Sequence, residues 1–293
     1  MAKVRKFYLQ NAAGDRIGLL GESGAYLTVP EGLGFELDPP WADLGRGFFQ
    51  PLDETYEPQG GIAGELVFIP PAYANYRSFV NWLAAAGSLL LIYCPFGDQE
   101  FQRVVSVEYL QKGELDKTKL LHCPVSFKAL SPWRLPTPTE ISMVSHSASG
   151  VRPSYPGRYS GRYGLDRDGT MAAKIPAIGH IPGSVLLRIR GAIVNPVIRL
   201  AGADSGTLFG LCRLTGASLG ASDVLELSTA WDDSYIRKIA ADGETTDLLP
   251  WLDISGEPFF RIPTTEATVL TVKSDGTFAG SAELLVYSYY RTV

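Results

Sequence analysis

Short stretches that alternate apolar and polar residues follow one another along most of the chain, and this pattern constrains the fold more than any other feature. Residues 64–69, 102–110 and 119–127 alternate with period two, carry β-branched and aromatic side chains, and are bounded by turn formers. Such alternation is typical of strands with one buried face. The 31 glycines and 20 prolines also favour short strands joined by turns. The sequence therefore predicts a mainly β protein.

One segment, residues 70–87, follows a helical pattern instead. Two prolines open it and Gly87 ends it, as expected at the two ends of a helix. Apolar residues recur between them at three- and four-residue spacing: Tyr73, Tyr76, Val80 and Leu83. Its polar positions carry a single charge, Arg77. This indicates an outer face that is not fully in water and is compatible with a packing partner.

The length of 293 residues allows either two domains or one large β-domain. Prolines stiffen residues 131–139, and residues 144–164 are rich in Ser, Gly, Arg and Tyr with little periodicity. This break favours two domains. The sequence predicts an N-terminal domain over residues 1–135, a linker or arm over 136–164, and a C-terminal domain over 165–293.

Strands resume in the C-terminal part with no helical pattern between them, which indicates an antiparallel β-sandwich. Asp-Gly pairs at residues 168–169, 242–243 and 275–276 predict hairpin turns. The reason is that both central positions of a type I′ turn need a positive φ.

Charge is scarce, at 19% of residues against about 25% in an ordinary soluble chain. The 26 basic and 31 acidic residues form no long cluster of either sign, so we do not expect the protein to grip nucleic acid. The N-terminus turns polar too early for a signal peptide, which predicts synthesis and retention in the cytosol. The apolar stretch at residues 89–94 is far shorter than the ~20 residues that span a bilayer, so no membrane insertion is expected.

No catalytic constellation or cofactor motif is evident, and the chain is predicted not to be an enzyme, with no cofactor and no metal. His122 beside Cys123 could form a two-ligand metal corner, but no third ligand lies at a useful spacing and a structural histidine is favoured. Residues 166–170 resemble part of a calcium loop without its later acidic ligand, so a plain turn is favoured. The widely spaced Cys94, Cys123 and Cys212 lie in apolar runs and are predicted to be buried thiols.

Two weaker hypotheses concern glycans. A glycan-degrading enzyme would need facing carboxylates, for which the candidates are also ordinary turn residues: Asp232, Asp233 and Asp253. A carbohydrate-binding module would need an aromatic platform, although aromatic residues of a sandwich more often belong to the core. The platform candidates are Trp231 and Trp251, with Tyr235 and Phe259 nearby in sequence.

Arginine and tyrosine interleave in the predicted arm. Because these residue types are favoured at interface hot spots, a partner could order this segment, while a solvated flexible linker is an equal alternative. The candidate partner-binding residues are Arg152, Tyr155, Arg158, Tyr159, Arg162 and Tyr163.

The order of elements in the first half is distinctive. After the helix come an apolar strand ending at residues 91–95, a strand at 101–110, a strand ending at 125–127, and then Ser131-Pro-Trp133. This order resembles the distal tail protein family of siphophage-type bacteriophages and prophages, whose N-terminal ring-forming domain closes with a similar signature. The second half is similar to the galectin-like sandwich of that family at residues 183–190, 192–200, 241–243 and 259–290.

The resemblance implies a fold and a role. The fold would be a β-barrel or sandwich-like ring-forming domain with one short α-helix, followed by a galectin-like antiparallel β-sandwich. The role would be that of a structural virion protein, a hexameric baseplate hub for host attachment. Its neighbours in the tail tip would be further copies of itself, the tail tube protein, the tape-measure protein, and a hub, fibre or receptor-binding protein. Genome DNA would only pass through the channel, and assembly would take place in the bacterial host cytoplasm.

Sugar binding does not follow from a galectin-like fold. A galectin site would need a His-x-Asn-x-Arg strand, and the region of residues 185–200 has Asn195 but no such triplet. The carbohydrate-binding module of a receptor-binding or cell-wall-associated protein therefore remains the alternative hypothesis.

Overall fold

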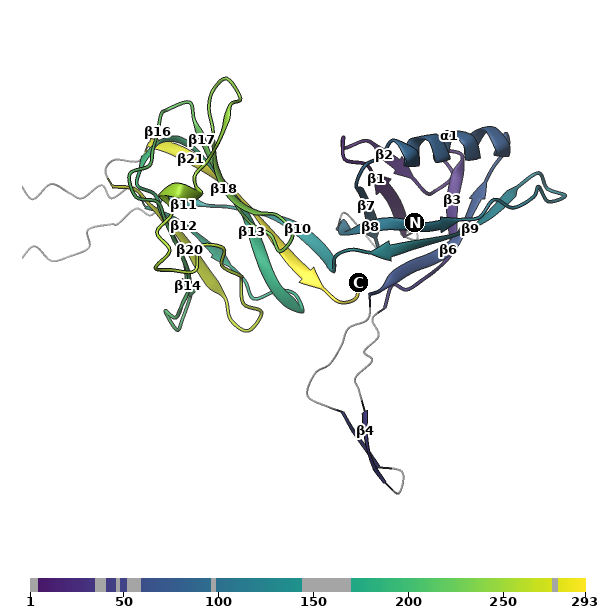
Figure 1. Ribbon diagram of the computed structural model, residues 1–293, viewed down its shortest axis with the longest axis horizontal. Helices are drawn as coiled ribbons and strands as arrows, with labels where there is room; N and C mark the ends of the chain where they lie inside the picture. The colour runs from purple at the N-terminus through teal and green to yellow at the C-terminus, as the bar shows by residue number, and fades with distance from the viewer. Residues whose placement is uncertain are drawn as a thin grey trace, which may run out of the picture. The chain divides into compact units, whose positions relative to one another are not determined.

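The computed structural model describes residues 5–34, 41–45, 48–51, 59–95, 99–143, 170–275 and 279–293 (Figure 1). The chain divides into two compact units, which are Met1–Pro136 with Tyr289–Val293, and Thr137–Ser288. The described residues are mostly in antiparallel strands, with a single α-helix. This confirms the predicted mainly β fold class, while the galectin-like character of the second unit stays a prediction.

Antiparallel strands in the order β3-β6-β9-β8-β7-β1-β2 form the first unit, and β10 pairs with β8 where Arg134 lies opposite Gln102. A separate two-stranded sheet consists of β4 and β5. The bounds of these strands are β1 Lys6–Gln10, β2 Arg16–Gly18, β3 Ala25–Glu31, β4 Trp41–Gly45, β5 Phe48–Pro51, β6 Gly61–Phe68, β7 Leu89–Cys94, β8 Phe101–Leu110, β9 Leu121–Ala129 and β10 Trp133–Thr139.

The barrel alternative for this unit was wrong, because the strand order does not close in the described part of the chain. β2 and β3 stand at its two ends and share no ladder. An isolated bridge joins Leu20, two residues after the end of β2, to Tyr26 within β3, without forming a ladder. An alternating strand has the same sequence pattern in an open sheet as in a closed barrel, so closure is decided by long-range pairing.

The helix α1, Ala72–Ala84, lies where the sequence predicts it and is followed by Gly87 with φ +66°. Its buried residues are Ala72 and Phe79, whereas Tyr73 is 41% exposed and donates a hydrogen bond from its hydroxyl to Glu114, at 3.1 Å. The buried face of α1 is therefore shifted by about one residue from the predicted stripe: Ala72 and Phe79 are buried in place of Tyr73 and Val80. Two overlapping stripes fit the same 3.6-residue period, and packing against the sheet selected the one that contains Phe79.

An aromatic cluster forms much of the core beneath α1. Phe79 and Tyr76 both meet Phe68 of β6 edge-on, at centroid distances of 5.6 and 5.4 Å. Trp133, at the start of β10, is fully buried, with its ring 6.1 Å from that of Tyr93 and the guanidinium of Arg103 5.5 Å from its centroid. Trp133 thus belongs to this core, although it is the first residue of the strand that leads out of the unit.

Two antiparallel sheets form the second unit, with strand orders β19-β18-β17-β13-β21 and β11-β12-β20-β14-β15, and β16 pairs with β13. The bounds are β11 Ser142–Met143, β12 Met171–Ile175, β13 Ile181–Val194, β14 Val197–Gly202, β15 Leu208–Arg213, β16 Ser218–Leu219, β17 Val224–Thr229, β18 Ser234–Ile239, β19 Thr245–Asp247, β20 Thr268–Lys273 and β21 Ala279–Tyr290, with a 3-10 turn η1 at Leu249–Trp251.

Alternate residues of both sheets share one aliphatic core, as the period-two pattern predicts. Gly243, with φ +89°, turns the hairpin between β18 and β19, which confirms a turn at residues 242–243, but Asp242 does not have a positive φ and the turn is not of type I′. The other two Asp-Gly pairs lie wholly or partly outside the described residues. The core residues include Val185, Leu187, Ile198, Leu200, Leu225, Leu227, Leu270 and Val272.

The first residues of the predicted linker form strands: most of residues 136–143 belong to β10 and β11. Residues 144–169 lie outside the described part of the chain. Tyr289–Val293 pack with the first unit, where the ring of Tyr290 meets Phe101 at 5.5 Å and the Thr292 hydroxyl donates to Leu33 O at 3.2 Å. Within the described residues, no helix has the length and apolarity that a membrane span requires.

Candidate functional site

His122 and Cys123 do not form a joint site, since successive residues of β9 point to opposite faces of the sheet. Cys123 is fully buried, and this burial raises the pKa of its thiol. The Nδ1 of His122 lies 3.0 Å from Glu65 Oε2, and its Nε2 lies 3.5 Å from Asp116 Oδ2. The hydrogen bond with Glu65, together with both nearby carboxylates, raises the pKa of His122. This is the partnered structural histidine that the sequence favours.

The other chemical candidates occupy ordinary structural positions. In the described part of the chain, no three His, Cys, Asp or Glu side chains are grouped to hold a metal ion. Cys94, Cys123 and Cys212 are buried and unpaired, as predicted. Asp253 accepts a hydrogen bond from the backbone of Ser255 at 2.9 Å, and this bond lowers its pKa. Such a short-range bond is that of a turn residue.

The two tryptophans of the predicted platform have different surroundings. Trp231 is 58% exposed, but the guanidinium of Arg261 lies over its ring at 4.4 Å, and its Nε1 donates to Pro182 O at 3.3 Å. Trp251 is 39% exposed and belongs to η1, where its backbone O accepts from Thr215 N at 2.9 Å. These contacts attach the two indoles to different residues, so the described residues form no shared aromatic platform. Sugar binding stays a prediction. The arginine and tyrosine residues of the predicted arm lie outside the described residues: Arg152, Tyr155, Arg158, Tyr159, Arg162 and Tyr163.

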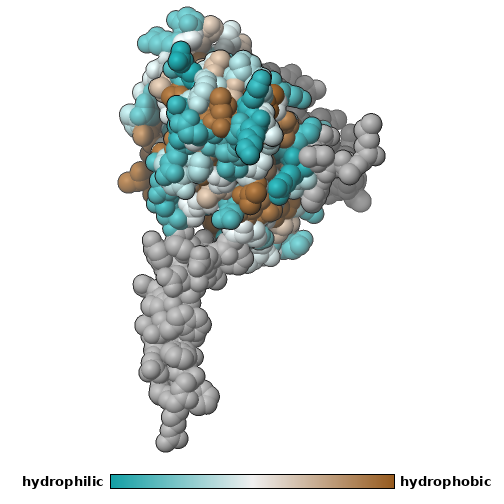
Figure 2. All heavy atoms as spheres, turned by 90° about the vertical axis from the view of Figure 1, so that its right-hand side faces the viewer, coloured by the Kyte–Doolittle hydropathy of each residue, from teal (hydrophilic) through white to brown (hydrophobic). Residues whose placement is uncertain are grey.

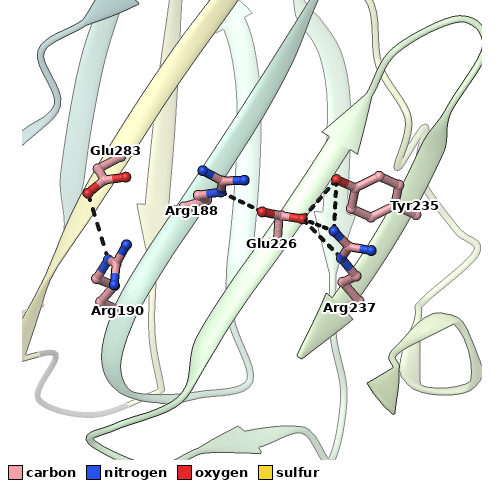
Figure 3. A network of polar contacts seen from close by, with 6 residues as sticks. All are labelled: Arg188, Arg190, Glu226, Tyr235, Arg237 and Glu283. Carbon is pink, nitrogen blue, oxygen red and sulfur yellow. Dashed lines mark hydrogen bonds and ion pairs between the residues drawn. The ribbon is translucent and has the colours of Figure 1, made fainter. Parts of the chain in front are cut away.

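A polar row crosses three strands of the second unit (Figure 3), on the sheet face opposite the core, because its residues alternate with the core residues Leu187, Ile189, Leu225 and Leu227. The strand register sets Glu226 of β17 between Arg188 of β13 and Arg237 of β18. The Arg188 Nε donates to Glu226 Oε2, and the Arg237 Nε donates to Oε1 at 2.9 Å. The Tyr235 hydroxyl adds a third donor to Oε1, at 2.8 Å. Figure 3 shows these donors converging on a single carboxylate.

Burial makes this row costly to disrupt. The side chain of Glu226 is 1% exposed, whereas those of Arg188 and Arg237 are 44% and 38% exposed. Burial alone would raise the pKa of Glu226, but the hydrogen bonds from Arg188, Tyr235 and Arg237 outweigh it and hold the pKa below its ordinary value. Burial and the bond to Glu226 raise the pKa of Tyr235 to about 12. Sequence reasoning missed this row, because the pairing that aligns Arg188, Glu226 and Arg237 is set by the register of strands distant in the sequence.

The outer face of α1 is a candidate assembly surface. Its exposed positions include Ser78 and Asn81, with Arg77 as their charged neighbour. Beside them Tyr73, Tyr76 and Val80 line a groove of about 440 Å³ with Lys112, whose Nζ lies 4.9 Å from the centroid of Tyr73. On the described part of the face that Figure 2 shows, hydrophobic side chains form small separate patches among hydrophilic ones.

Comparison with protein families identifies the first unit. Residues 6–130 match the family model of the distal tail protein, N-terminal domain. A search of curated proteins gave no match.

Comparison with solved structures extends the likeness to nearly the whole chain. A chain in the baseplate of phage P2, in its activated conformation with calcium, is 13% identical and superposes with a TM-score of 0.67, covering 99% of this chain and 100% of that one. The same baseplate with strontium gives equal values. The Dit protein of phage SPP1 is 8% identical with a TM-score of 0.58, covering 96% and 98%. At such identities the likeness shows the fold alone. Together with the match at residues 6–130, it confirms the resemblance to the distal tail proteins of bacteriophages, and this chain carries the N-terminal domain of that family.

Proposed function

We propose that this protein is a structural virion component, a hexameric ring hub at the distal end of a phage tail that joins the tail tube to the baseplate or tail-tip adsorption apparatus. The observation that carries the proposal is the family match at residues 6–130 combined with a fold likeness over 99% of the chain. One of the similar chains belongs to a phage baseplate, and the SPP1 protein is described as a hub of the adsorption apparatus. We transfer that role to this chain.

The physical properties of the chain support assembly. Charged residues make up only 19% of the sequence, and the outer face of α1 offers the single charge of Arg77. A ring of identical subunits covers such surfaces and leaves no subunit edge unpaired. We propose that α1 contributes to the contact between neighbouring subunits.

The remaining partners follow from this placement at the virion tail tip. The ring would contact the tail tube protein, the tape-measure protein and a hub, fibre or receptor-binding protein, after assembly in the bacterial host cytoplasm. Genome DNA would pass through the channel without being held, which suits a chain with a net charge of −5. The role we propose is structural and includes no catalytic step.

Electron microscopy of the purified protein, with native mass spectrometry beside it, tests the ring. We expect particles with a central hole and a mass of six subunits, or of twelve if two rings stack. A protein that stays monomeric at high concentration, and that no tail partner assembles, would overturn the proposal.

A paired set of variants tests the role of α1. Ser78→Glu with Asn81→Glu places two carboxylates on exposed positions of the helix, and we expect the ring to dissociate while the subunit stays folded. Thr245→Glu, at an exposed position of β19, is the matched control and should leave the ring intact. A ring that survives both changes would place the subunit contact on another surface.

The carbohydrate-binding alternative rests on the exposed indoles of Trp231 and Trp251. A glycan array tests it directly. Binding that Trp251→Ala and Trp231→Ala each abolish would support the alternative, whereas an array without any binding would remove it.

A further inference from the structure

The outer face of the sheet β11-β12-β20-β14-β15 carries a groove in the second unit, apart from the subunit contact that we propose for α1. Alternation along β14 turns Ile198 and Leu200 into the core and leaves Val197 and Arg199 on the opposite face. A groove of about 660 Å³ runs over this face, and its lining includes the apolar residues Val197, Leu208 and Leu211 and the basic residues Arg199, Arg213 and Lys273.

The strand register concentrates the three basic residues. Val197 of β14 lies opposite Arg213 of β15 on one side and opposite Lys273 of β20 on the other. Neighbouring strands are about 4.8 Å apart, so the α-carbons of Arg213 and Lys273 are about 10 Å apart across Val197. Arg199 lies two residues further along β14, on the same face. Three positive charges thus surround one apolar side chain.

These charges are not neutralised by ion pairs within the described residues. On the other sheet of the same unit, Arg188, Arg190, Arg237 and Lys238 all pair with carboxylates. By contrast, no described carboxylate lies within ion-pair distance of the three basic residues of the groove. Unpaired like charges at neighbouring positions repel one another, which favours the binding of an anionic partner.

Among the described carboxylates, Asp275 and Asp253 lie near the groove, and their hydrogen bonds are with other residues. Asp275 lines it and accepts a hydrogen bond from Asn195 Nδ2 at 3.0 Å. Asp253 is close enough for the charge of Arg213 to contribute to its lowered pKa, but its main partner is the backbone of Ser255. The amide of Asn195 does not cancel the charge of Asp275, so the lining holds three basic side chains against one carboxylate and keeps a net positive charge on a chain whose net charge is −5.

The apolar part of the lining distinguishes between anionic ligands. Leu208 is 51% exposed, and Val197 and Leu211 lie between the charges. Free phosphate or a nucleic acid backbone would bind the arginines but leave the apolar residues exposed to water. A peptide can place carboxylates on the basic residues and apolar side chains on the apolar ones. A second hollow of about 330 Å³ shares Val197, Arg213 and Asp275 with the groove and is also lined by Thr215, so the two hollows adjoin.

We propose that this groove is a docking site for an acidic peptide segment of a partner protein, with its carboxylates on Arg199, Arg213 and Lys273 and an apolar side chain on Val197 and Leu211. The site lies within the second unit, so the proposal does not depend on the ring.

Fluorescence anisotropy with the full chain tests the proposal. The probe is a labelled octapeptide that alternates glutamate with leucine or valine. We expect saturable binding that weakens at least tenfold when glutamine replaces its glutamates. Arg199→Gln with Arg213→Gln should also weaken it at least tenfold, whereas the matched control Arg190→Gln, on the other sheet, should change it less than twofold. Unchanged melting temperatures would show that the variants are folded.

Three results would overturn the proposal. The first is no saturable binding of the probe. The second is an equal loss of binding with Arg190→Gln. The third is that an all-glutamate octapeptide or inorganic phosphate competes as well as the probe, which would reduce the groove to a general anion-binding surface. Because a ring seen by electron microscopy is compatible with any of these results, failure here is distinguishable from failure of the proposed function.

Discussion

The two units of this chain are both antiparallel β structures, but they are stabilised in different ways. In the first, aromatic rings pack on one another, and Phe68, Phe79 and Trp133 lie at its centre. In the second, the core is mostly aliphatic, and arginines lie over aromatic rings outside it, as Arg261 does over Trp231 and Arg237 over Tyr235, whereas Arg103 of the first unit lies over the fully buried Trp133. Its charged side chains gather on the outer faces of its two sheets.

This difference separates two kinds of task. A rigid core with a weakly charged helix suits a unit that packs against copies of itself. A sandwich with one neutralised polar row and one cationic groove suits a unit that meets other partners. The comparison predicts that the two units respond to different mutations and to opposite changes of pH.

The largest effect is expected from Trp133→Ala in the first unit. Trp133 is fully buried between Tyr93 and Arg103, and its loss should reduce the free energy of unfolding of that unit by about 4 kcal/mol. Differential scanning calorimetry should show one transition moving to lower temperature while the other stays. Trp251→Ala, at a 39% exposed position, is the control and should leave the first-unit transition in place. A joint shift of both transitions would show that the units unfold together.

The next largest effect is expected from Glu226→Ala in the second unit. The change removes the only described carboxylate that Arg188 and Arg237 share, and should destabilise this unit by about 3 kcal/mol. Glu283→Ala is the matched control, because its pair with Arg190 spans 3.7 Å between exposed side chains and should contribute less than about 0.5 kcal/mol. Urea unfolding followed by circular dichroism measures both. Equal losses would mean that the burial of Glu226 has no energetic weight.

Acid should remove part of the same contribution. The folded-state pKa of Glu226 is lower than its ordinary value of 4.5, so the row stabilises the unit above that pH and loses this effect as the pH falls through the folded pKa. The melting temperature of the second unit should drop between pH 5 and pH 3, and the drop should be smaller in Glu226→Gln. If both proteins give the same profile, other carboxylates cause the acid sensitivity.

The smallest effect is expected from His122 in the first unit. Its contribution to stability is lost as the pH rises, whereas that of Glu226 is lost as the pH falls. Its raised folded-state pKa means that its contribution is complete below the ordinary value of 6.5 and is lost as the pH rises through the folded pKa. Since His122 and Glu65 are each 39% exposed, the loss should be only about 0.3 kcal/mol. Precise thermal melts of the wild type and His122→Gln between pH 5.5 and 8.5 would reveal it. A wild-type profile as flat as that of the variant would contradict the assignment.

Strands and their buried faces were largely predictable, because burial on one face has a direct signature of period two. β9 shows it clearly, with Leu121, Cys123, Val125 and Phe127 all buried. The helix was predictable in position but not in rotation, since Phe79 and Val80 fit the same period and only the facing sheet distinguishes them.

The interaction surfaces were much less predictable. Arg188, Glu226 and Arg237 are separated by 38 and 11 residues, and Arg199, Arg213 and Lys273 by 14 and 60. Nothing local marks either set, because the register of distant strands aligns them. The sequence instead drew attention to Trp231 and Trp251, whose residue type suggests a sugar platform but which the described contacts attach to different partners.

The sequence by itself determined the mainly β class, the place of α1, the buried thiols and the resemblance to the distal tail protein family. Each of these depends on residue type and spacing within a short window, where local propensity and periodic burial act. Among the described residues, the tertiary structure alone decided that the first sheet does not close, that Tyr289–Val293 pack with the first unit, and that one sheet of the second unit pairs its arginines with carboxylates while Arg199 and Arg213 of the other have no such ion pair. Those features depend on which strands pair and in which register, and long-range packing sets both.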